Sequence, residues 1–368
     1  MIKLKDVASY VSEKVDTGLL KAQDYITTDN MLSNRGGIII SNSLPKAEKV
    51  TKFERGDILV SNIRPYFKKI WYATFNGGCS NDVIVFRANG INSKFLYYVL
   101  SQNVFFDYMM AGANGTKMPR GNKKLIPDFE FLNFSPVQQE HISSILSRFD
   151  SLIENNQKQI KLLEEAARRL YKEWFVDLRF PGYKNVEIVK GIPIGWNKCF
   201  IDDIFQITYG KTLPTSKISN EGSYPVYGAN GIIGYYNEKN CDDYTVLITS
   251  RGNGSGDVSR THDKESFVTN NSFIVKPRNS LYRVSYVYQL MKHTDFKRVC
   301  TGSAQPQLTN TSISTIIVNK PAEEVIDLFC NRTDNLYQKI ESLLRQNLFL
   351  EEARDRLLPK LMSGEIEV

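Results

Sequence analysis

The 368-residue chain has few of the residues that metal sites and covalent catalysis need. It contains 3 histidines and 5 cysteines, and no two cysteines are spaced as C-x-x-C. This composition predicts neither a disulfide framework nor a zinc site, and it is typical of a reducing compartment. No apolar run approaches the roughly 18 residues of a transmembrane helix, and the N-terminus lacks a signal-type apolar segment. We therefore expect a cytoplasmic protein.

Catalytic and cofactor motifs are also missing. Residues 209–212 (YGKT) resemble the end of a phosphate-binding loop, but Phe205 stands where that loop needs its first glycine. The glycine-rich segment 251–257 lacks the G-x-G-x-x-G spacing, so we interpret it as a flexible surface loop. No Asn/Asp-Pro-Pro-aromatic tetrapeptide of an adenine methyltransferase occurs. The sequence predicts a non-catalytic chain without a metal or cofactor of its own.

What the chain does contain is a repeat. Residues 162–170 (LLEEAARRL) return 187 residues later as 349–357 (FLEEARDRL), and 115–119 (GTKMP) correspond to 302–306 (GSAQP) at the same separation. A chain repeated once at half its length predicts two similar units related by an approximate two-fold axis. Two similar but unlike heads suit a DNA target with two unlike halves, and the net charge of +7 is compatible with a polyanionic partner.

Each half of the repeat predicts a mixed α/β (α+β) globular domain. Short runs rich in β-branched and aromatic residues, separated by Gly, Asn and Pro, predict strands, and each half then has a helical stretch. The expected strands are 38–40, 58–61, 70–74, 83–86, 244–249 and 273–276, and the expected helices are 93–107 and 283–292. We expect recognition domains at 1–134 and 190–318.

Long helices at 135–180 and 319–362 follow these domains. Apolar residues recur in steps of three and four from Leu146 to Trp174 and from Leu336 to Leu361, which predicts two heptad seams on helices roughly 60 Å long. Either each seam packs on its own domain, or the two form an antiparallel coiled coil, which we favour. In that pairing Asn156 lies opposite Asn347, and the facing amides fix the register.

The helical motifs resemble a known family. Residues 163–177 (LEEAARRLYKEWFVD) and 357–366 (LLPKLMSGEI) are similar to the central and distal conserved regions of the specificity subunits of Type I restriction-modification systems. Residues 224–235 (YPVYGANGIIGY) resemble a segment common in their recognition domains. The first domain has no close equivalent of this segment, so we expect it to read an unrelated half-site.

The resemblance implies two pseudo-two-fold-related recognition domains separated by a long antiparallel two-helix coiled coil. Such a subunit reads an asymmetric, bipartite target in double-stranded DNA, and its helices set the spacer between the halves. Two DNA adenine methyltransferase subunits carrying S-adenosylmethionine are implied as partners, and two motor-nuclease subunits are allowed. The residues expected to dock partners are Glu164, Arg168, Arg169, Trp174, Arg354 and Arg356.

Residues that read DNA need polar or cationic side chains on loops. The candidates in the first domain are Arg35, Asn62, Arg64, Lys68, Lys69, Lys117, Arg120, Lys123 and Lys124. Those in the second domain are Lys211, Thr212, Tyr227, Asn230, Arg251, Asn253, Ser255, Arg260, Gln305 and Gln307. Two other functions stay open: a free-standing DNA-binding regulator and a coiled-coil adaptor that binds no nucleic acid.

Overall fold

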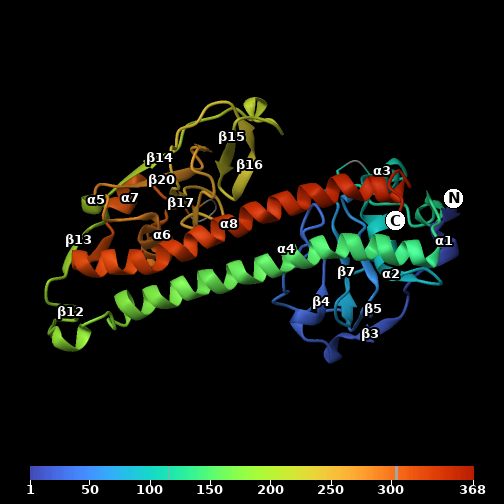
Figure 1. Ribbon diagram of the computed structural model, residues 1–368. Helices are drawn as coiled ribbons and strands as arrows, with labels where there is room; N and C mark the ends of the chain where they lie inside the picture. Colours follow the sequence, from blue (N-terminus) through green and yellow to red (C-terminus); the bar gives the residue numbers. More distant parts are fainter. Residues whose placement is uncertain (116, 303–305) are drawn as a thin grey trace. The chain divides into compact units, whose positions relative to one another are not determined.

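The computed structural model describes residues 1–115, 117–302 and 306–368. The chain forms two compact units: unit 1 is Met1–Glu154 with Leu348–Val368, and unit 2 is Asn155–Asn347. Helix α4 (Pro136–Tyr171) and helix α8 (Glu323–Met362) each contribute one segment to unit 1 and one to unit 2 (Figure 1). Both predicted long helices are therefore present, and each globular part packs together with helical segments from both.

Unit 1 contains two four-stranded sheets. The first has the order β2-β9-β6-β7, and all its neighbours are antiparallel. The second has the order β3-β5-β8-β4, with β4 and β8 parallel. A short ribbon of β1 and β10 lies beside helix α1. The strands are β1 (Ile2–Lys3), β2 (Ala8–Tyr10), β3 (Lys14–Asp16), β4 (Tyr25–Ile26), β5 (Lys49–Phe53), β6 (Ile58–Ser61), β7 (Ile70–Tyr72), β8 (Gly77–Cys79), β9 (Val83–Ala88) and β10 (Glu130–Phe131), and the helices are α1 (Leu4–Val7), α2 (Ser93–Ser101) and α3 (Asn103–Ala111).

The main core of unit 1 lies between its first sheet and its helices. Side chains from α2 and α3, among them Phe95 and Phe105, pack with Leu146 of α4 and Leu361 of α8. A second apolar cluster contains Phe53 and side chains from both sheets. Because successive strand residues face opposite sides, β6 contributes to both clusters, which explains why all four of its residues are buried.

Unit 2 repeats this plan. Its main sheet has the order β14-β20-β17-β18, its ribbon pairs β13 with β21, and its second sheet has the order β16-β15-β19. The strands are β11 (Ile188–Val189), β12 (Ile192–Pro193), β13 (Asn197–Phe200), β14 (Phe205–Tyr209), β15 (Tyr224–Gly228), β16 (Gly231–Tyr236), β17 (Val246–Thr249), β18 (Val258–Arg260), β19 (Phe267–Val268), β20 (Ser272–Pro277) and β21 (Ile317–Lys320), and the helices are α5 (Ile201–Ile204), α6 (Val284–His293) and α7 (Asn310–Ser314).

The internal repeat predicted from the sequence is confirmed by this topology. The order β2-β9-β6-β7 in unit 1 corresponds strand for strand to β14-β20-β17-β18 in unit 2. In both units a short parallel pair, β4 with β8 and β15 with β19, belongs to the second sheet. The second sheets otherwise differ, in agreement with the absence of a 224–235 equivalent from the first domain.

Two local predictions are wrong. Residues 38–40 form no strand: Ile38 makes only an isolated bridge to Met31, and Ile39 and Ile40 are 53% and 70% exposed. The stretch 93–107 is two helices, because Gln102 adopts an extended backbone with ψ of 151° between α2 and α3. Propensity alone shows neither the missing partner strand nor the break.

The heptad seam of unit 2 pairs the two long helices in antiparallel order. Trp174 contacts Phe329 with ring centroids 5.9 Å apart, and further along the seam Asn156 Nδ2 donates to Asn347 Oδ1 at 2.9 Å. The amides are 6% and 7% exposed, so the predicted Asn–Asn pairing is confirmed. A π-helical turn at Lys172–Val176 continues α4 and directs Trp174 and Phe175 into the core of unit 2.

Candidate nucleic-acid interface

One arrangement of three loops occurs in each unit, at the same end of its main sheet. In unit 1 the loop after β6 receives and gives main-chain hydrogen bonds: Asn62 N donates to Asp82 O, Arg64 N to Pro119 O, and Gly121 N to Asn62 O. In unit 2 the corresponding bonds are Ser250 N to Asn271 O, Gly252 N to Pro306 O, and Leu308 N to Ser250 O. The third loop of each arrangement also contains an antiparallel main-chain bridge, between Asn114 and Arg120 in unit 1 and between Thr301 and Gln307 in unit 2. We call these two arrangements the loop frames.

The loop frame of unit 1 carries exposed cations. Lys117 and Arg120 are exposed, and the Arg120 guanidinium lies 3.3 Å from Asp82 Oδ1. Lys123 Nζ donates to the Asn81 carbonyl at 3.4 Å, and Lys124 is exposed. Arg64 and Lys68 are half-buried at the base of the same frame, while Lys69 donates to the Thr28 carbonyl at 2.6 Å and is held in the domain.

The loop frame of unit 2 presents a different set of side chains. Arg251 and Asn253 are exposed on the loop after β17, and Arg251 forms a main-chain bridge with Gln307, whose side chain is also exposed. Among the described residues no side chain bonds to the Arg251 guanidinium. A guanidinium has five N–H donors, which match a base edge or a phosphate.

Three more predicted residues lie on the surface close to this frame. Lys211 is exposed, and its main chain bonds to Val268 O. Thr212 is exposed, and its hydroxyl accepts from Asn270 Nδ2 at 3.2 Å. Asn230 is exposed at the turn between β15 and β16. These positions remain candidates for DNA contact.

Three predicted DNA-reading residues of unit 2 are instead buried. Tyr227 is 3% exposed, its hydroxyl donates to Asp263 Oδ2 at 2.9 Å, and burial raises its pKa. Ser255 is 3% exposed and donates to the Ser250 carbonyl. Arg260 is 5% exposed and forms an ion pair with Glu341 of α8. All three side chains are buried and make these contacts inside the protein, so we remove them from the interface.

Arg35 of unit 1 is corrected for the same reason. Its Nε donates to the Ser101 carbonyl at 2.5 Å and its Nη2 to Asn103 Oδ1 at 2.7 Å. Its Nη1 lies 3.7 Å from Asp355 of α8, and the side chain is 11% exposed. Burial is the main cause of a lowered pKa of this guanidinium, which the neighbouring carboxylate opposes. Asn62 is likewise buried at 6% exposure, and Gln305 lies outside the described residues.

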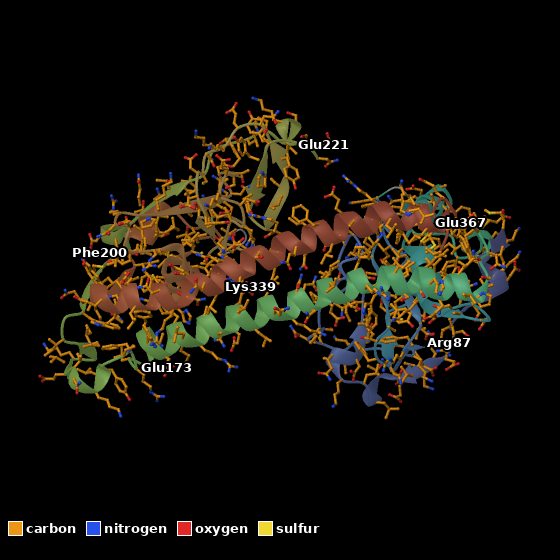
Figure 2. All side chains as sticks on the ribbon, viewed as in Figure 1. Arg87, Glu173, Phe200, Glu221, Lys339 and Glu367 are labelled. Atoms are coloured by element: carbon orange, nitrogen blue, oxygen red, sulfur yellow. The ribbon has the colours of Figure 1, made fainter. Side chains whose placement is uncertain are left out.

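Some of the predicted partner-docking residues are exposed and others are buried. Arg168, Arg169 and Arg356 are 53%, 76% and 79% exposed on the long helices, and Glu164 is half-buried. Arg168 and Arg169 both bond to Glu165, whose pKa they lower to about 2. Other charged side chains of these helices, such as Glu173 and Lys339, are also exposed (Figure 2).

Trp174 and Arg354 are not available for docking. Trp174 is 3% exposed and lies in the core of unit 2, with the Arg332 guanidinium 5.3 Å from its ring. Arg354 is 13% exposed and bonds to Asp150 Oδ1 at 2.8 Å, where Asp150 also accepts the Tyr98 hydroxyl at 2.5 Å. Each side chain therefore makes its contacts inside its own unit, Trp174 in unit 2 and Arg354 in unit 1.

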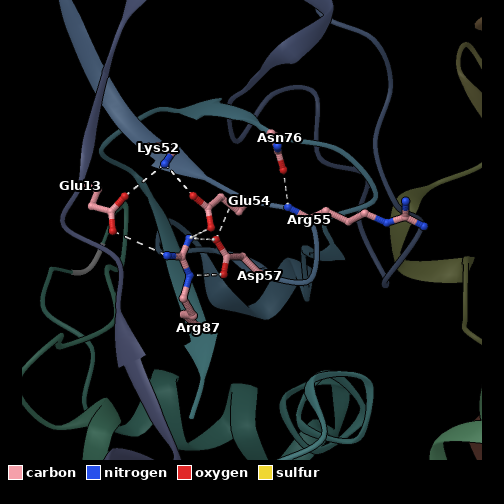
Figure 3. A network of polar contacts seen from close by, with 7 residues as sticks. All are labelled: Glu13, Lys52, Glu54, Arg55, Asp57, Asn76 and Arg87. Carbon is pink, nitrogen blue, oxygen red and sulfur yellow. Dashed lines mark hydrogen bonds and ion pairs between the residues drawn. The ribbon is translucent and has the colours of Figure 1, made fainter.

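A separate charged cluster in unit 1 does not belong to the interface. Arg87 makes a two-point contact with Asp57 at 2.8 Å and a further contact with Glu54 at 3.2 Å, while Lys52 joins Glu54 to Glu13 (Figure 3). Three carboxylates surround two cations here, so the cluster has no cationic excess for a phosphate. It links the residue before β3, strand β5 and the turn between β5 and β6 to β9.

Sequence reasoning missed two features of the unit 1 frame. Asp82, which pairs with Arg120, was not predicted, although residues 80–82 (SND) and 269–271 (TNN) stand at corresponding places in the two halves of the repeat. The exposed aromatic side chains of Tyr66 and Phe67 were also missed, although the run RPYFKK signals them by placing two rings between cations. Among the described residues there is no group of three or more metal-ligating side chains. No described helix is long and apolar enough to cross a membrane.

Two similar α/β units that present one loop frame with different side chains define a protein with a duplicated, asymmetric recognition surface. The chain matches the family model of the Type I restriction modification DNA specificity domain over residues 1–165 and 193–341. It belongs to this family.

Named relatives agree with this assignment. The chain is similar to the Type I restriction enzyme MjaIX specificity subunit of Methanocaldococcus jannaschii, at 26% identity over 96% of this chain and 87% of that protein. It is also similar to the HindI specificity subunit of Haemophilus influenzae, at 23% identity over 99% of this chain and 98% of that protein. The crystal structure of a Type I restriction-modification S subunit from M. genitalium shares the fold, with a TM-score of 0.61, 20% identity, and coverage of 98% of this chain and 95% of that chain.

Proposed function

We propose that this chain is the non-catalytic recognition subunit of a Type I restriction-modification complex and reads an asymmetric, bipartite sequence in double-stranded DNA. The observation that carries the proposal is the duplicated loop frame. The two frames share their main-chain hydrogen bonds but differ at equivalent positions, with Arg251 and Gln307 in one and Ile63 and Arg120 in the other. Unlike side chains on like frames read unlike half-sites.

The long helices are proposed to set the spacer between the half-sites and to dock the partner subunits. Each helix of 36 to 40 residues is long compared with one duplex turn of about 34–36 Å. The exposed charges of Arg168, Arg169 and Arg356 are on these helices. The partners we propose are two DNA adenine methyltransferase subunits, with two motor-nuclease subunits where restriction occurs.

We further propose that the chemistry belongs to the partners, in the cytoplasm where the DNA is. The methyltransferase subunits bind S-adenosylmethionine, and this chain contributes sequence discrimination and a scaffold. The support for this division is the lack of a methyltransferase tetrapeptide and of a complete phosphate loop in the sequence.

The test is a DNA-binding titration of the chain alone and with its methyltransferase subunits, at several salt concentrations. We expect specific binding only in the complex, and an affinity that falls steeply with salt because cations on the loop frames displace counterions. Tight specific binding by the chain alone supports the regulator instead. Salt-independent or absent DNA binding by an intact complex supports the adaptor.

A further inference from the structure

We propose that Tyr66 and Phe67 of unit 1 form an aromatic wedge that stacks against DNA bases in one half-site. This inference rests on the proposed function and adds a contact of a different kind from the cationic and amide contacts above. The wedge is carried by the loop between β6 and β7, residues 62–69, whose centre is the 3-10 turn Pro65–Phe67.

The two rings are held out in solvent. Tyr66 is 47% and Phe67 is 37% exposed, and their ring centroids are 4.7 Å apart. Among the described residues of unit 1 the only other exposed aromatic side chain is Phe349 on α8. Exposed apolar side chains that cluster mark an interaction site, since scattered ones cost nothing and clustered ones favour association.

The loop is held in this form at a conformational cost. Four of the six non-glycine residues with positive φ in the described parts of the chain are here or in the adjoining turn: Arg64, Lys68, Asn34 and Arg35. The turn donates to the loop, from Asn34 N to Phe67 O at 2.8 Å and from Arg35 N to Lys68 O at 3.0 Å. Such backbone strain persists where surrounding structure enforces it, and it concentrates at functional sites.

The buried contacts of Arg35 now have an explanation in this context. Its guanidinium ties the turn to the carbonyl of Ser101 at the end of α2 and to Asn103 at the start of α3. The turn in turn holds the main chain of Phe67 and Lys68. The rings therefore project from a rigid support, and little ordering entropy is lost when they stack on a ligand.

The surrounding charge selects a polyanion as the ligand. Arg64 and Lys68 flank the rings in the loop. Arg64 N also donates to Pro119 O, in a segment whose Lys117 and Arg120 side chains are exposed. Aromatic rings among cations are the arrangement with which proteins bind bases and phosphates together. Ring insertion opens a base step, and a methyltransferase must take its target adenine out of the stack.

Only unit 1 carries this aromatic wedge. The equivalent loop of unit 2, residues 250–257, has glycines at 252, 254 and 256 and no aromatic residue. We therefore assign the stacking contact to the half-site read by unit 1, and the deformation of DNA to that side of the target.

The experiment uses the complex of this chain with its methyltransferase subunits and a duplex that carries its mapped target, with 2-aminopurine in either half-site. We compare the wild type, the double variant Tyr66→Ala/Phe67→Ala, and Tyr183→Ala, a tyrosine that is 38% exposed outside both loop frames. We expect the double variant to raise Kd about tenfold or more. The slope of log K against log salt stays unchanged because no cation is lost. We expect the double variant to lose the rise in 2-aminopurine emission on DNA binding when the probe is in the unit 1 half-site, and to keep it when the probe is in the other half-site.

Three results overturn the wedge. The first is an unchanged Kd and emission signal in a folded double variant. The second is loss of methyltransferase binding, which makes the rings a protein contact. The third is a reduced salt slope with unchanged emission, which makes the loop a phosphate contact only. If the double variant does not fold, Phe67→Leu keeps the apolar volume without the ring and is expected to lose the emission signal. Failure of the wild-type complex to bind DNA contradicts the proposed function itself.

Discussion

Arg251 and Arg260 are nine positions apart but differ in exposure, and this difference decides the role proposed for each. Arg251 follows β17 and presents an exposed guanidinium on the loop frame of unit 2. Arg260 ends β18, and its guanidinium packs 4.8 Å from the Tyr337 ring and pairs with Glu341. The first is proposed to read DNA, while the second joins the sheet to helix α8 within unit 2.

Substitution of Arg251 tests direct reading. If it contacts a guanine, Arg251→Ala costs roughly 1–3 kcal/mol of binding free energy and relaxes one base position of the motif. If it contacts a phosphate, the loss is uniform across sequences and the salt slope falls by about 1. Competition binding over a library of single-base target variants separates these results. Wild-type affinity and motif in the variant contradict the assignment.

Substitution of Glu341 tests the structural role of Arg260. The two side chains are 11% and 3% exposed, so Glu341→Gln leaves a buried guanidinium without its counter-charge and lowers the free energy of unfolding by about 3–5 kcal/mol. The double variant Arg260→Met/Glu341→Leu, which buries no charge, is expected to recover most of this loss. Denaturant unfolding gives both values. Equal stability of wild type and Glu341→Gln refutes a buried ion pair.

The strand β18 contains a signal that sequence reasoning did not use. Its burial alternates, with Val258 and Arg260 facing inward and Ser259 half-buried between them. Because strand residues two apart share a face, the apolar Val258 places Arg260 on the core side. No such signal exists for Tyr227, because a register shift between Val226 and Tyr227 buries both neighbours. Local sequence does not show a bulge of this kind.

At the scale of elements, the long helices were the most predictable part of the fold. Their apolar spacing specifies a seam whatever the rest of the chain does, and the repeat supplies the partner seam. The Asn156–Asn347 pairing followed from these two facts and is present at 2.9 Å. The break at Gln102 and the irregular segment 38–40 were not predictable, because propensity shows neither an interruption inside a helical stretch nor the lack of a partner strand.

The paired amides give a prediction about helix register. Asn156→Leu or Asn347→Leu alone leaves one buried amide without a partner and costs about 1–3 kcal/mol of unfolding free energy. The double Leu variant is expected to be more stable than either single variant and less specific in register. Calorimetric unfolding of the four proteins forms a double-mutant cycle. A coupling free energy of zero would show that the amides act independently and do not fix the register.

At the scale of the whole chain, two units share one strand order and one loop frame yet present different side chains. The repeat was visible in the sequence because the helices and the glycine-proline loops are similar in both halves. The differences lie in the second sheets and in the loops after β6 and β17. Which loop residues face solvent depends on tertiary packing, so the predicted DNA-reading set contained both exposed and buried side chains.

The central claim is that two unlike heads read two unlike half-sites. The most direct test maps methylated adenines, by single-molecule sequencing, in DNA from cells that express this chain with its methyltransferase subunit. We predict one bipartite motif with two different halves, a fixed gap, and one methylated adenine in each half. A palindromic motif, in which one half-site is read twice, or a functional complex whose gap varies freely, would contradict the account.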